Sequence, residues 1–208
     1  PRLHTNFKLD AQGEELFLAD NGGNIIDQVF TGQLPADFSR GRQPDGSNQW
    51  YLFPEATPGD SNNTAGYPGI AVDPELDLTP GFYPAPIGVT ITAGSGNSTI
   101  RYTLDGSIPQ DTSEIYSSPI VLNSTTVLRV RGFEPGLLPG NIITATYFIS
   151  FFTPLPVISL STDPPNLWDW ETGIYVLGPI AEPDPPHFGA NFWQDWERPI
   201  HIEFYEPG

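Results

Sequence analysis

The sequence contains no cysteine and no methionine, and only eight of its 208 residues are lysine or arginine. Without cysteine, disulfide bonds, thiol nucleophiles and thiolate metal sites are excluded. Without methionine the sequence has no initiator residue, which predicts a processed or partial product. The 25 acidic residues bring the formal net charge to −17, so phosphate backbones and anionic membranes would be repelled. Calcium, cationic surfaces and neutral glycans remain open as partners.

Long apolar runs are also missing, because none approaches the length of a membrane span, and no signal peptide is recognisable. Glycine and proline are abundant instead, with 21 and 24 residues that separate short apolar runs. With 12% aromatic residues, this pattern predicts a loop-rich β protein whose small cores rest on aromatic side chains. The acidic, proline-rich composition favours a secreted or cell-surface protein that neither inserts into a membrane nor binds nucleic acid.

Short strands are predicted along most of the chain from apolar alternation with a period of two. Two of them flank a turn at residues 20–24, and the polar residues 62–73 form a predicted linker. Between residues 74 and 150 the strands are regularly spaced with no helical period, which predicts an immunoglobulin-like sandwich. We expect Ile100, Tyr102 and Leu104 to share the core-facing side of one strand in that sandwich.

Two motif sets in the first 150 residues resemble known modules. Residues 3–9, 13–16 and 35–42 carry a pattern that resembles the C-terminal half of a lamin-tail-like domain of bacterial surface proteins. The resemblance implies that residues 1–61 are a partial β-sandwich whose first strands would precede Pro1. Residues 102–109, with the closing residues 144–149, are similar to the chitobiase/β-hexosaminidase C-terminal domain. This implies that residues 74–150 form an immunoglobulin-like accessory module without an active site.

The remaining residues carry a third set of motifs. Residues 155–160, 166–169, 172–176 and 191–199 resemble the N-terminal edge of CotH-like proteins, the spore-coat kinase family. The resemblance implies that residues 154–208 begin a β-rich domain whose nucleotide-binding and catalytic segments would lie beyond Gly208. The predicted fold class is therefore mainly β, with tandem immunoglobulin-like β-sandwich modules followed by the start of a β-rich CotH-like domain.

No catalytic residue is predicted, and we expect this chain not to be an enzyme. It has no P-loop, no glycine-rich nucleotide loop and no nucleophile elbow. His4, His187 and His201 show neither zinc-motif spacing nor the spacing of a catalytic base with a serine. Asp195 and Glu197 would share one face of a strand, as paired glycosidase acids do. The simpler interpretation is that both are solvated or pair with the neighbouring arginine.

Three groups of residues are candidates for binding or packing. Trp168, Trp170, Trp193 and Trp196 are candidates to stack on glycan rings, and the alternative places them in a core or at an interface with the immunoglobulin-like module. Asp163, Asp169 and Glu171 are candidate calcium ligands or, alternatively, caps of a short helical turn near Trp168. Residues 20–24 have some features of a calcium loop, although a plain hairpin turn explains them better. No other cofactor is predicted.

Phe151 and Phe152 are the predicted inter-module packing residues, because four large or apolar side chains follow the last strand of the sandwich with almost no linker. Residues 74–208 would then behave as one rigid body, with a hinge at residues 60–72. The predicted function is a non-catalytic structural or adhesive segment of a large secreted or cell-surface protein, which displays or docks other modules. The alternative is an accessory, glycan-binding segment of an extracellular enzyme, either carbohydrate-active or an atypical CotH-type kinase.

Overall fold

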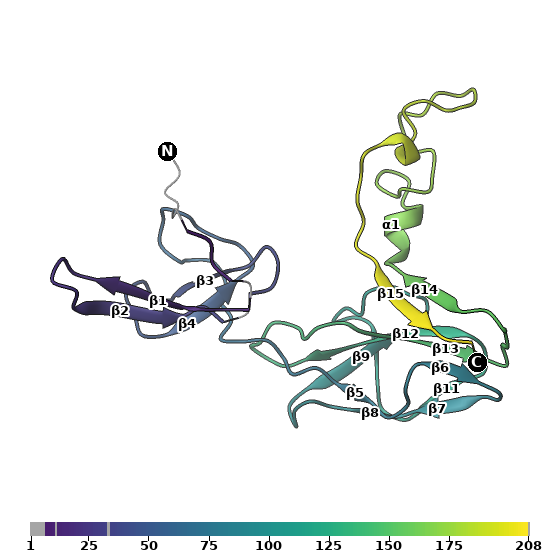
Figure 1. Ribbon diagram of the computed structural model, residues 1–208, viewed down its shortest axis with the longest axis horizontal. Helices are drawn as coiled ribbons and strands as arrows, with labels where there is room; N and C mark the ends of the chain where they lie inside the picture. Colours follow the sequence, from purple (N-terminus) through teal and green to yellow (C-terminus); the bar gives the residue numbers. More distant parts are fainter. Residues whose placement is uncertain (1–6, 11, 33, 208) are drawn as a thin grey trace. The chain divides into compact units, whose positions relative to one another are not determined.

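The computed structural model describes residues 7–10, 12–32 and 34–207, and it is mainly β, as the sequence predicts (Figure 1). The chain divides into two compact units, residues 1–69 and residues 70–208. His4 and the rest of the motif at residues 3–6 lie outside the described residues. Among the described residues, no helix is both long and apolar enough to cross a membrane.

Two antiparallel hairpins build the first unit. Their strands are β1 (Glu15–Ala19), β2 (Ile25–Phe30), β3 (Ser39–Arg42) and β4 (Trp50–Phe53). The turn between β1 and β2 closes on Asp20, whose carboxylate accepts the backbone N–H groups of Gly22 and Asn24 at 2.8 and 2.9 Å. The side-chain amide of Asn24 also donates to Asp20 and lowers the pKa of that carboxyl group. Residues 20–24 therefore form a hairpin turn in which the chain itself satisfies the carboxylate.

A two-layer β-sandwich forms the main body of the second unit. One layer is a five-stranded sheet in the order β10-β9-β12-β13-β6, in which only β13 and β6 run parallel. The opposite layer consists of the antiparallel pairs β5-β8 and β7-β11. The bounds are β5 (Glu75–Leu76), β6 (Gly81–Tyr83), β7 (Ile87–Val89), β8 (Ile91–Thr92), β9 (Thr99–Thr103), β10 (Glu114–Ile115), β11 (Ile120–Leu122), β12 (Thr126–Phe133) and β13 (Ile143–Ile149). This is an immunoglobulin-like arrangement, which confirms the sandwich predicted for this part of the chain.

The core of the sandwich lies between these two layers. Its fully buried side chains alternate along the strands, as a period of two requires. They include Val89, Leu122, Leu128, Val130 and Tyr147. Tyr147 keeps its hydroxyl satisfied by donating to the carbonyl oxygen of Leu78 at 2.8 Å. Burial raises the pKa of Tyr147, so this group stays a neutral donor.

The expectation for the strand at residues 100–104 is correct in two of three positions. Ile100 is buried and Tyr102 packs against the core, but Leu104 is exposed. The alternation fails because β9 ends at Thr103 and the chain then turns. Asp105 organises that turn by accepting the backbone N–H of Ser107 at 3.0 Å. Leu104 consequently leaves the pleat before its side chain can reach the core.

A third layer covers the other face of the five-stranded sheet. It is the antiparallel hairpin of β14 (Val157–Ser161) and β15 (His201–Tyr205), which lies opposite the layer of β5, β7, β8 and β11 (Figure 1). The carboxylate of Glu203 accepts the backbone N–H and the hydroxyl of Thr146, and also the hydroxyl of Tyr205 at 2.6 Å. The Tyr205 ring meets the Phe148 ring edge-on at a centroid distance of 5.2 Å. Burial raises the pKa of Tyr205, and the Glu203 carboxylate adds to that rise.

Arg129 forms a second polar connection between the sheet and the hairpin. Its Nη1 donates to the carbonyl oxygen of Gly106 at 2.8 Å and its Nη2 to that of Ser161 at 3.3 Å. The residue is buried, and desolvation lowers the pKa of its guanidinium group, while the negative charge of Asp163 opposes that change. The sheet and the hairpin are thus held together largely by hydrogen bonds to charged groups, which contribute about 1.5–3 kcal/mol each.

The junction after β13 differs from the prediction. Phe152 is 80% exposed, so its predicted burial between modules is wrong. Phe151 is 46% exposed and packs on the rings of Phe82 and Phe148 at centroid distances of 6.2 and 5.8 Å, so it is about half-buried against the sandwich. Ser150, with a φ of 53°, turns the chain away from the sheet. Tyr205 of the hairpin meets the same Phe82 and Phe148 rings edge-on. Phe151 and Phe152 also line a surface hollow of about 470 Å³.

Adjacent positions on β11 test the sandwich core. Leu122 is 2% exposed, whereas Val121 points outward and is 63% exposed. Replacing Leu122 with Ala removes buried methyl groups and leaves a cavity, so the free energy of unfolding should fall by about 2–5 kcal/mol. Val121→Ala, measured in the same urea titration, should change it by less than about 0.5 kcal/mol. Equal losses in the two variants would contradict the assignment of the core.

The contact between β13 and β15 is tested by Glu203→Gln. The substitution keeps the shape of the side chain but removes its negative charge and one of its two acceptor oxygens, so docking of the hairpin should weaken by about 1.5–3 kcal/mol. Hydrogen exchange at the amides of β14 and β15 should speed up, while the amides of β12 stay protected. Glu206→Gln is the matched control, because Glu206 is exposed and lies beyond β15. An unchanged exchange rate in Glu203→Gln would show that the carboxylate does not hold the hairpin.

Candidate functional site

Residues 162–200 join β14 to β15 and project from the sandwich, and we refer to them as the projecting segment (Figure 1). The segment contains α1 (Pro164–Trp168) and the short 3₁₀ helix η1 (Asn191–Trp193). The prolines at the first turn of α1 suit positions that need no intrahelical N–H donor. After α1 the carboxylate of Asp169 accepts the backbone N–H groups of Glu171 and Thr172 and the Thr172 hydroxyl. The hydrogen bond from the Thr172 side chain is the largest cause of the lowered pKa of Asp169.

A buried amide, rather than an apolar cluster, lies at the centre of the projecting segment. Asn191 is 1% exposed, and its Nδ2 donates to the carbonyl oxygens of Trp170 at 3.2 Å and Gly173 at 3.0 Å. Its backbone N–H donates to the carbonyl oxygen of Leu177 at 2.9 Å. Gly178 packs so closely on the Asn191 side chain that a β-carbon there would collide with it. Distant parts of the segment are therefore joined by one side chain.

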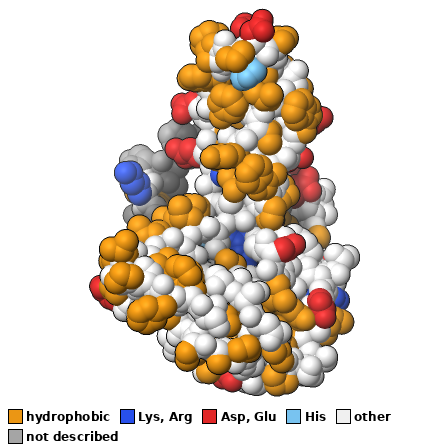
Figure 2. All heavy atoms as spheres, turned by 90° about the vertical axis from the view of Figure 1, so that its right-hand side faces the viewer, with side chains coloured by type: hydrophobic (Ala, Val, Ile, Leu, Met, Phe, Trp, Pro, Cys, Tyr) orange, Lys and Arg blue, Asp and Glu red, His pale blue; other side chains and the backbone are white. Residues whose placement is uncertain are grey.

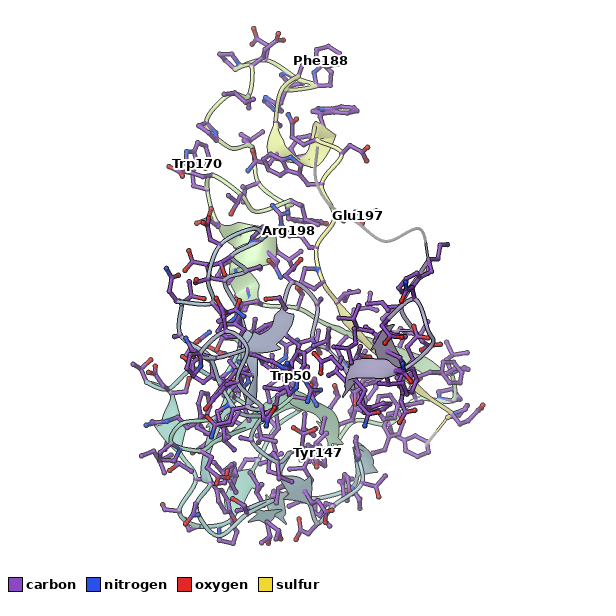
Figure 3. All side chains as sticks on the ribbon, turned by 90° about the vertical axis from the view of Figure 1, so that its left-hand side faces the viewer. Trp50, Tyr147, Trp170, Phe188, Glu197 and Arg198 are labelled. Carbon is purple, nitrogen blue, oxygen red and sulfur yellow. The ribbon has the colours of Figure 1, made fainter. Side chains whose placement is uncertain are left out.

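The tryptophans lie on the outside of the projecting segment. Trp168, Trp170, Trp193 and Trp196 are between 40% and 58% exposed, so the interpretation that they form a core is wrong. Figure 2 shows hydrophobic side chains gathered over the projecting segment, in the upper part of the view, with acidic side chains among them. Trp170 and Phe188 lie at its periphery, whereas Tyr147 lies within the sandwich (Figure 3).

These exposed rings form separate small groups. Trp168 meets Tyr175 edge-on at a centroid distance of 5.2 Å. Trp193 lies 5.9 Å from Phe188, and its Nε1 donates to the carbonyl oxygen of Pro186 at 3.0 Å. Among the described residues, no ring contact joins the Trp168 group to the Trp193 group. The rings are thus accessible to a ligand but are not arranged as one stacking platform, and glycan stacking stays a prediction.

The three candidate calcium ligands are not brought together. The part of the chain that the structure describes holds no group of three or more acidic, histidine or cysteine side chains placed to bind a metal ion. The Asp163 carboxylate accepts the backbone N–H of Ile108 at 3.3 Å and does not cap α1. Asp169 is occupied by the turn described above, and Glu171 is exposed. The structure therefore does not gather Asp163, Asp169 and Glu171 into one group, and of the three only Asp169 organises a turn near Trp168.

The carboxylates of Asp195 and Glu197 are exposed, in agreement with the simpler of the two interpretations. Arg198 pairs with neither of them. Its guanidinium donates to the backbone carbonyl oxygens of Thr172 and Glu197 and lies over the Trp196 ring at 5.3 Å from the centroid. Nδ1 of His187 contacts the carbonyl oxygen of Glu182 at 2.9 Å.

One surface was missed by the sequence reasoning. Ile158, Leu160, Ile202 and Phe204 form the outer face of the β14-β15 hairpin, each at 61% or 62% exposure, and we refer to them as the outer hairpin face. Ile158 pairs with Phe204 and Leu160 with Ile202, so the four side chains make one apolar patch. The polar alternates, among them Ser159 and Glu203, face the sheet instead. The alternation of apolar and polar residues in both strands is visible in the sequence, but it normally predicts that the apolar side chains face the core. In this hairpin they face solvent instead.

A hollow lies next to this face. It has a volume of about 320 Å³ and is lined by Leu160, Leu167 and Trp168, together with residues from the sandwich such as Leu104 and Val127. The exposed Leu104 thus contributes to a surface site rather than to the core. Leu160 belongs both to the outer hairpin face and to the wall of the hollow, and Trp168 lines the hollow too, so the three adjoin one another.

The buried amide of Asn191 is tested by Asn191→Ala. Loss of the Nδ2 donor leaves two carbonyl oxygens without a partner, which should destabilise the projecting segment by about 1–3 kcal/mol. The amides of Ile174 and Tyr175 bond to Asn166 and Leu167 and should exchange faster. The amides of β12 should be unaffected. The control Asn97→Ala removes an exposed amide from a turn and should change neither set; protection of Ile174 and Tyr175 that survives in Asn191→Ala would refute the assigned role.

Comparison with known proteins gives a family match for one part of the chain. Residues 89–147 match the family described as Fn3 associated. The matched stretch runs from the end of β7 to β13 and so covers most of the five-stranded sheet and its core. No curated protein and no solved structure matches the chain. The sandwich is thus similar to a fibronectin-III-associated module, which indicates a structural or accessory role for this part of the chain.

Proposed function

We propose that this chain is a non-catalytic structural segment of a secreted or cell-surface protein, and that its apolar surface at residues 155–204 docks another module. The sandwich would act as the support, and the β14-β15 hairpin with the projecting segment would be the part presented to the partner. The partner is another domain of the same polypeptide or of another surface protein.

The observation that carries this proposal is that the alternating apolar side chains of the β14-β15 hairpin face solvent rather than the sheet. The two strands turn Ser159 and Glu203 to the sheet, together with the Tyr205 ring, and turn the four apolar side chains of the outer hairpin face to solvent. A two-stranded hairpin with one uncovered apolar face is only marginally stable in water. Contiguous exposed apolar patches mark interaction sites. A covering module would bury the outer hairpin face and the adjoining hollow together.

Composition and resemblance support the remaining parts of the proposal. The acidic, proline-rich sequence without cysteine or methionine suits an extracellular protein. Resemblance to lamin-tail-like, chitobiase C-terminal and CotH-like modules supports a multidomain surface protein as the context. The absence from the sequence of a phosphate-binding loop and of a nucleophile motif supports a non-catalytic role.

A second candidate function is supported by the exposed tryptophans. Rings that are about half exposed, such as those of Trp168 and Trp170, are available to stack on sugars. The chain would then be an accessory segment of a carbohydrate-active enzyme. Saturable quenching of tryptophan fluorescence by a neutral oligosaccharide would favour this candidate over docking of a protein module.

Footprinting tests the docking proposal. Carbene labelling of Ile158, Leu160, Ile202 and Phe204 should be severalfold lower in the natural polypeptide on the producing cell than in the isolated 208-residue chain, because a docked module covers them. Val121, an exposed apolar side chain on the sandwich, provides the internal reference and should label equally in both samples. Equal labelling of the outer hairpin face in the two samples would reject the proposal.

A further inference from the structure

The part of the chain that carries the proposed docking surface is strongly acidic. Residues 154–207 include nine aspartate and glutamate residues and a single lysine or arginine, Arg198. That arginine is already engaged, since its guanidinium donates to two backbone carbonyl oxygens and lies on Trp196. The second unit therefore offers no free cation within this stretch to neutralise its carboxylates. A partner that covers the surface has to supply positive charge.

Several of these carboxylates have no partner within the described residues. Glu171, Asp195 and Glu197 are exposed, and their side chains form no hydrogen bond or ion pair there. By contrast, Asp169 and Glu203 are satisfied by the chain itself. Asp195 and Glu197 lie two residues apart and Glu171 lies elsewhere in the projecting segment, and among the described residues no three carboxylates gather to hold a metal ion. Such a distribution suits several separate cations rather than one.

Three of the unpaired carboxylates lie next to an exposed ring in the sequence. Glu171 follows Trp170, and Asp195 and Glu197 flank Trp196. An aromatic face attracts a guanidinium or ammonium group, and a nearby carboxylate adds to that attraction. The position of Arg198 over Trp196, 5.3 Å from the ring centroid, shows that this surface accepts a guanidinium in that way. Trp168, Trp170 and Trp193 are also exposed, at 54% to 58%.

From these observations we infer that the docked partner is a protein surface on which arginine or lysine side chains alternate with apolar ones. The apolar residues cover the outer hairpin face, while the cations lie between the tryptophans and the unpaired carboxylates of the projecting segment. This inference rests on the proposed docking function and names the chemistry of its partner. Anionic lipids and nucleic acids are repelled by the same charges.

The inference is tested with three matched synthetic peptides and the complete 208-residue chain. One peptide alternates arginine with leucine, the second replaces arginine with its neutral analogue citrulline, and the third replaces leucine with serine. Fluorescence anisotropy should show that the arginine–leucine peptide binds about tenfold or more tightly than either of the others. Its affinity should fall as salt rises, because exposed charges are screened over about 10 Å at 0.1 M salt.

Variants of the chain locate the binding. The triple substitution Glu171→Gln, Asp195→Asn and Glu197→Gln should weaken binding of the arginine–leucine peptide about tenfold. The control triple changes the net charge equally at exposed positions elsewhere. It consists of Glu55→Gln, Glu75→Gln and Asp111→Asn, and it should leave the affinity within about twofold. Trp170→Leu keeps an apolar side chain but removes the ring, so it should cost a further two- to fivefold, as expected for an exposed cation–π contact.

Three outcomes would overturn the inference. They are equal affinity for the arginine and citrulline peptides, equal loss in the two triple variants, and no binding of the arginine–leucine peptide. Each is distinguishable from failure of the docking proposal, because the footprinting experiment does not depend on the charge of the partner. Protection of the outer hairpin face without a preference for arginine would leave docking standing and reject the basic partner.

Discussion

Glu203 lies where the hairpin meets the sandwich, and its carboxylate accepts two donors from Thr146 and one from Tyr205. A carboxylate covered in this way has to be satisfied, so the face of β15 that carries Glu203 has to lie against the sheet. Because side chains alternate along a strand, this constraint decides the orientation of the whole hairpin. Arg129 reinforces it by donating to the backbone of Ser161 on β14.

The orientation of the hairpin determines which apolar side chains reach solvent. With Ser159 and Glu203 facing the sheet, Ile158 and Phe204 have to face away from it. The projecting segment follows the same plan, because its centre is the amide of Asn191 and its rings lie outside. The projecting segment therefore has a polar centre with exposed rings, and the hairpin turns Glu203 and Tyr205 to the sheet while its outer apolar side chains face solvent. That combination is unfavourable in water and is consistent with a surface that is covered in the assembled protein.

Charge limits what can cover this surface. The hairpin and the projecting segment carry nearly all their ionisable side chains as carboxylates, and the one arginine among them is engaged with Trp196 and two carbonyl oxygens. Coulomb repulsion disfavours a second acidic surface, including another copy of this chain, whose net charge is −17. The sandwich itself adds no chemistry to the site. Its contribution is a rigid sheet whose outer face presents Thr146, Phe148 and Arg129 to the hairpin.

The sequence by itself determined the mainly β architecture and the immunoglobulin-like sandwich, because short apolar runs with a period of two and strong turn residues act locally. It also determined the hairpin turn at Asp20, where a single carboxylate closes the loop. It could not decide whether Phe151, Leu104 and the tryptophans are buried, because an apolar side chain is buried only where another layer of the structure covers it. Tertiary structure decided these, because β9 ends before Leu104, Ser150 turns the chain before Phe151, and the centre of the projecting segment is the amide of Asn191 rather than the tryptophan rings. The outward orientation of Ile158 and Phe204 follows from the contact of Glu203 with Thr146.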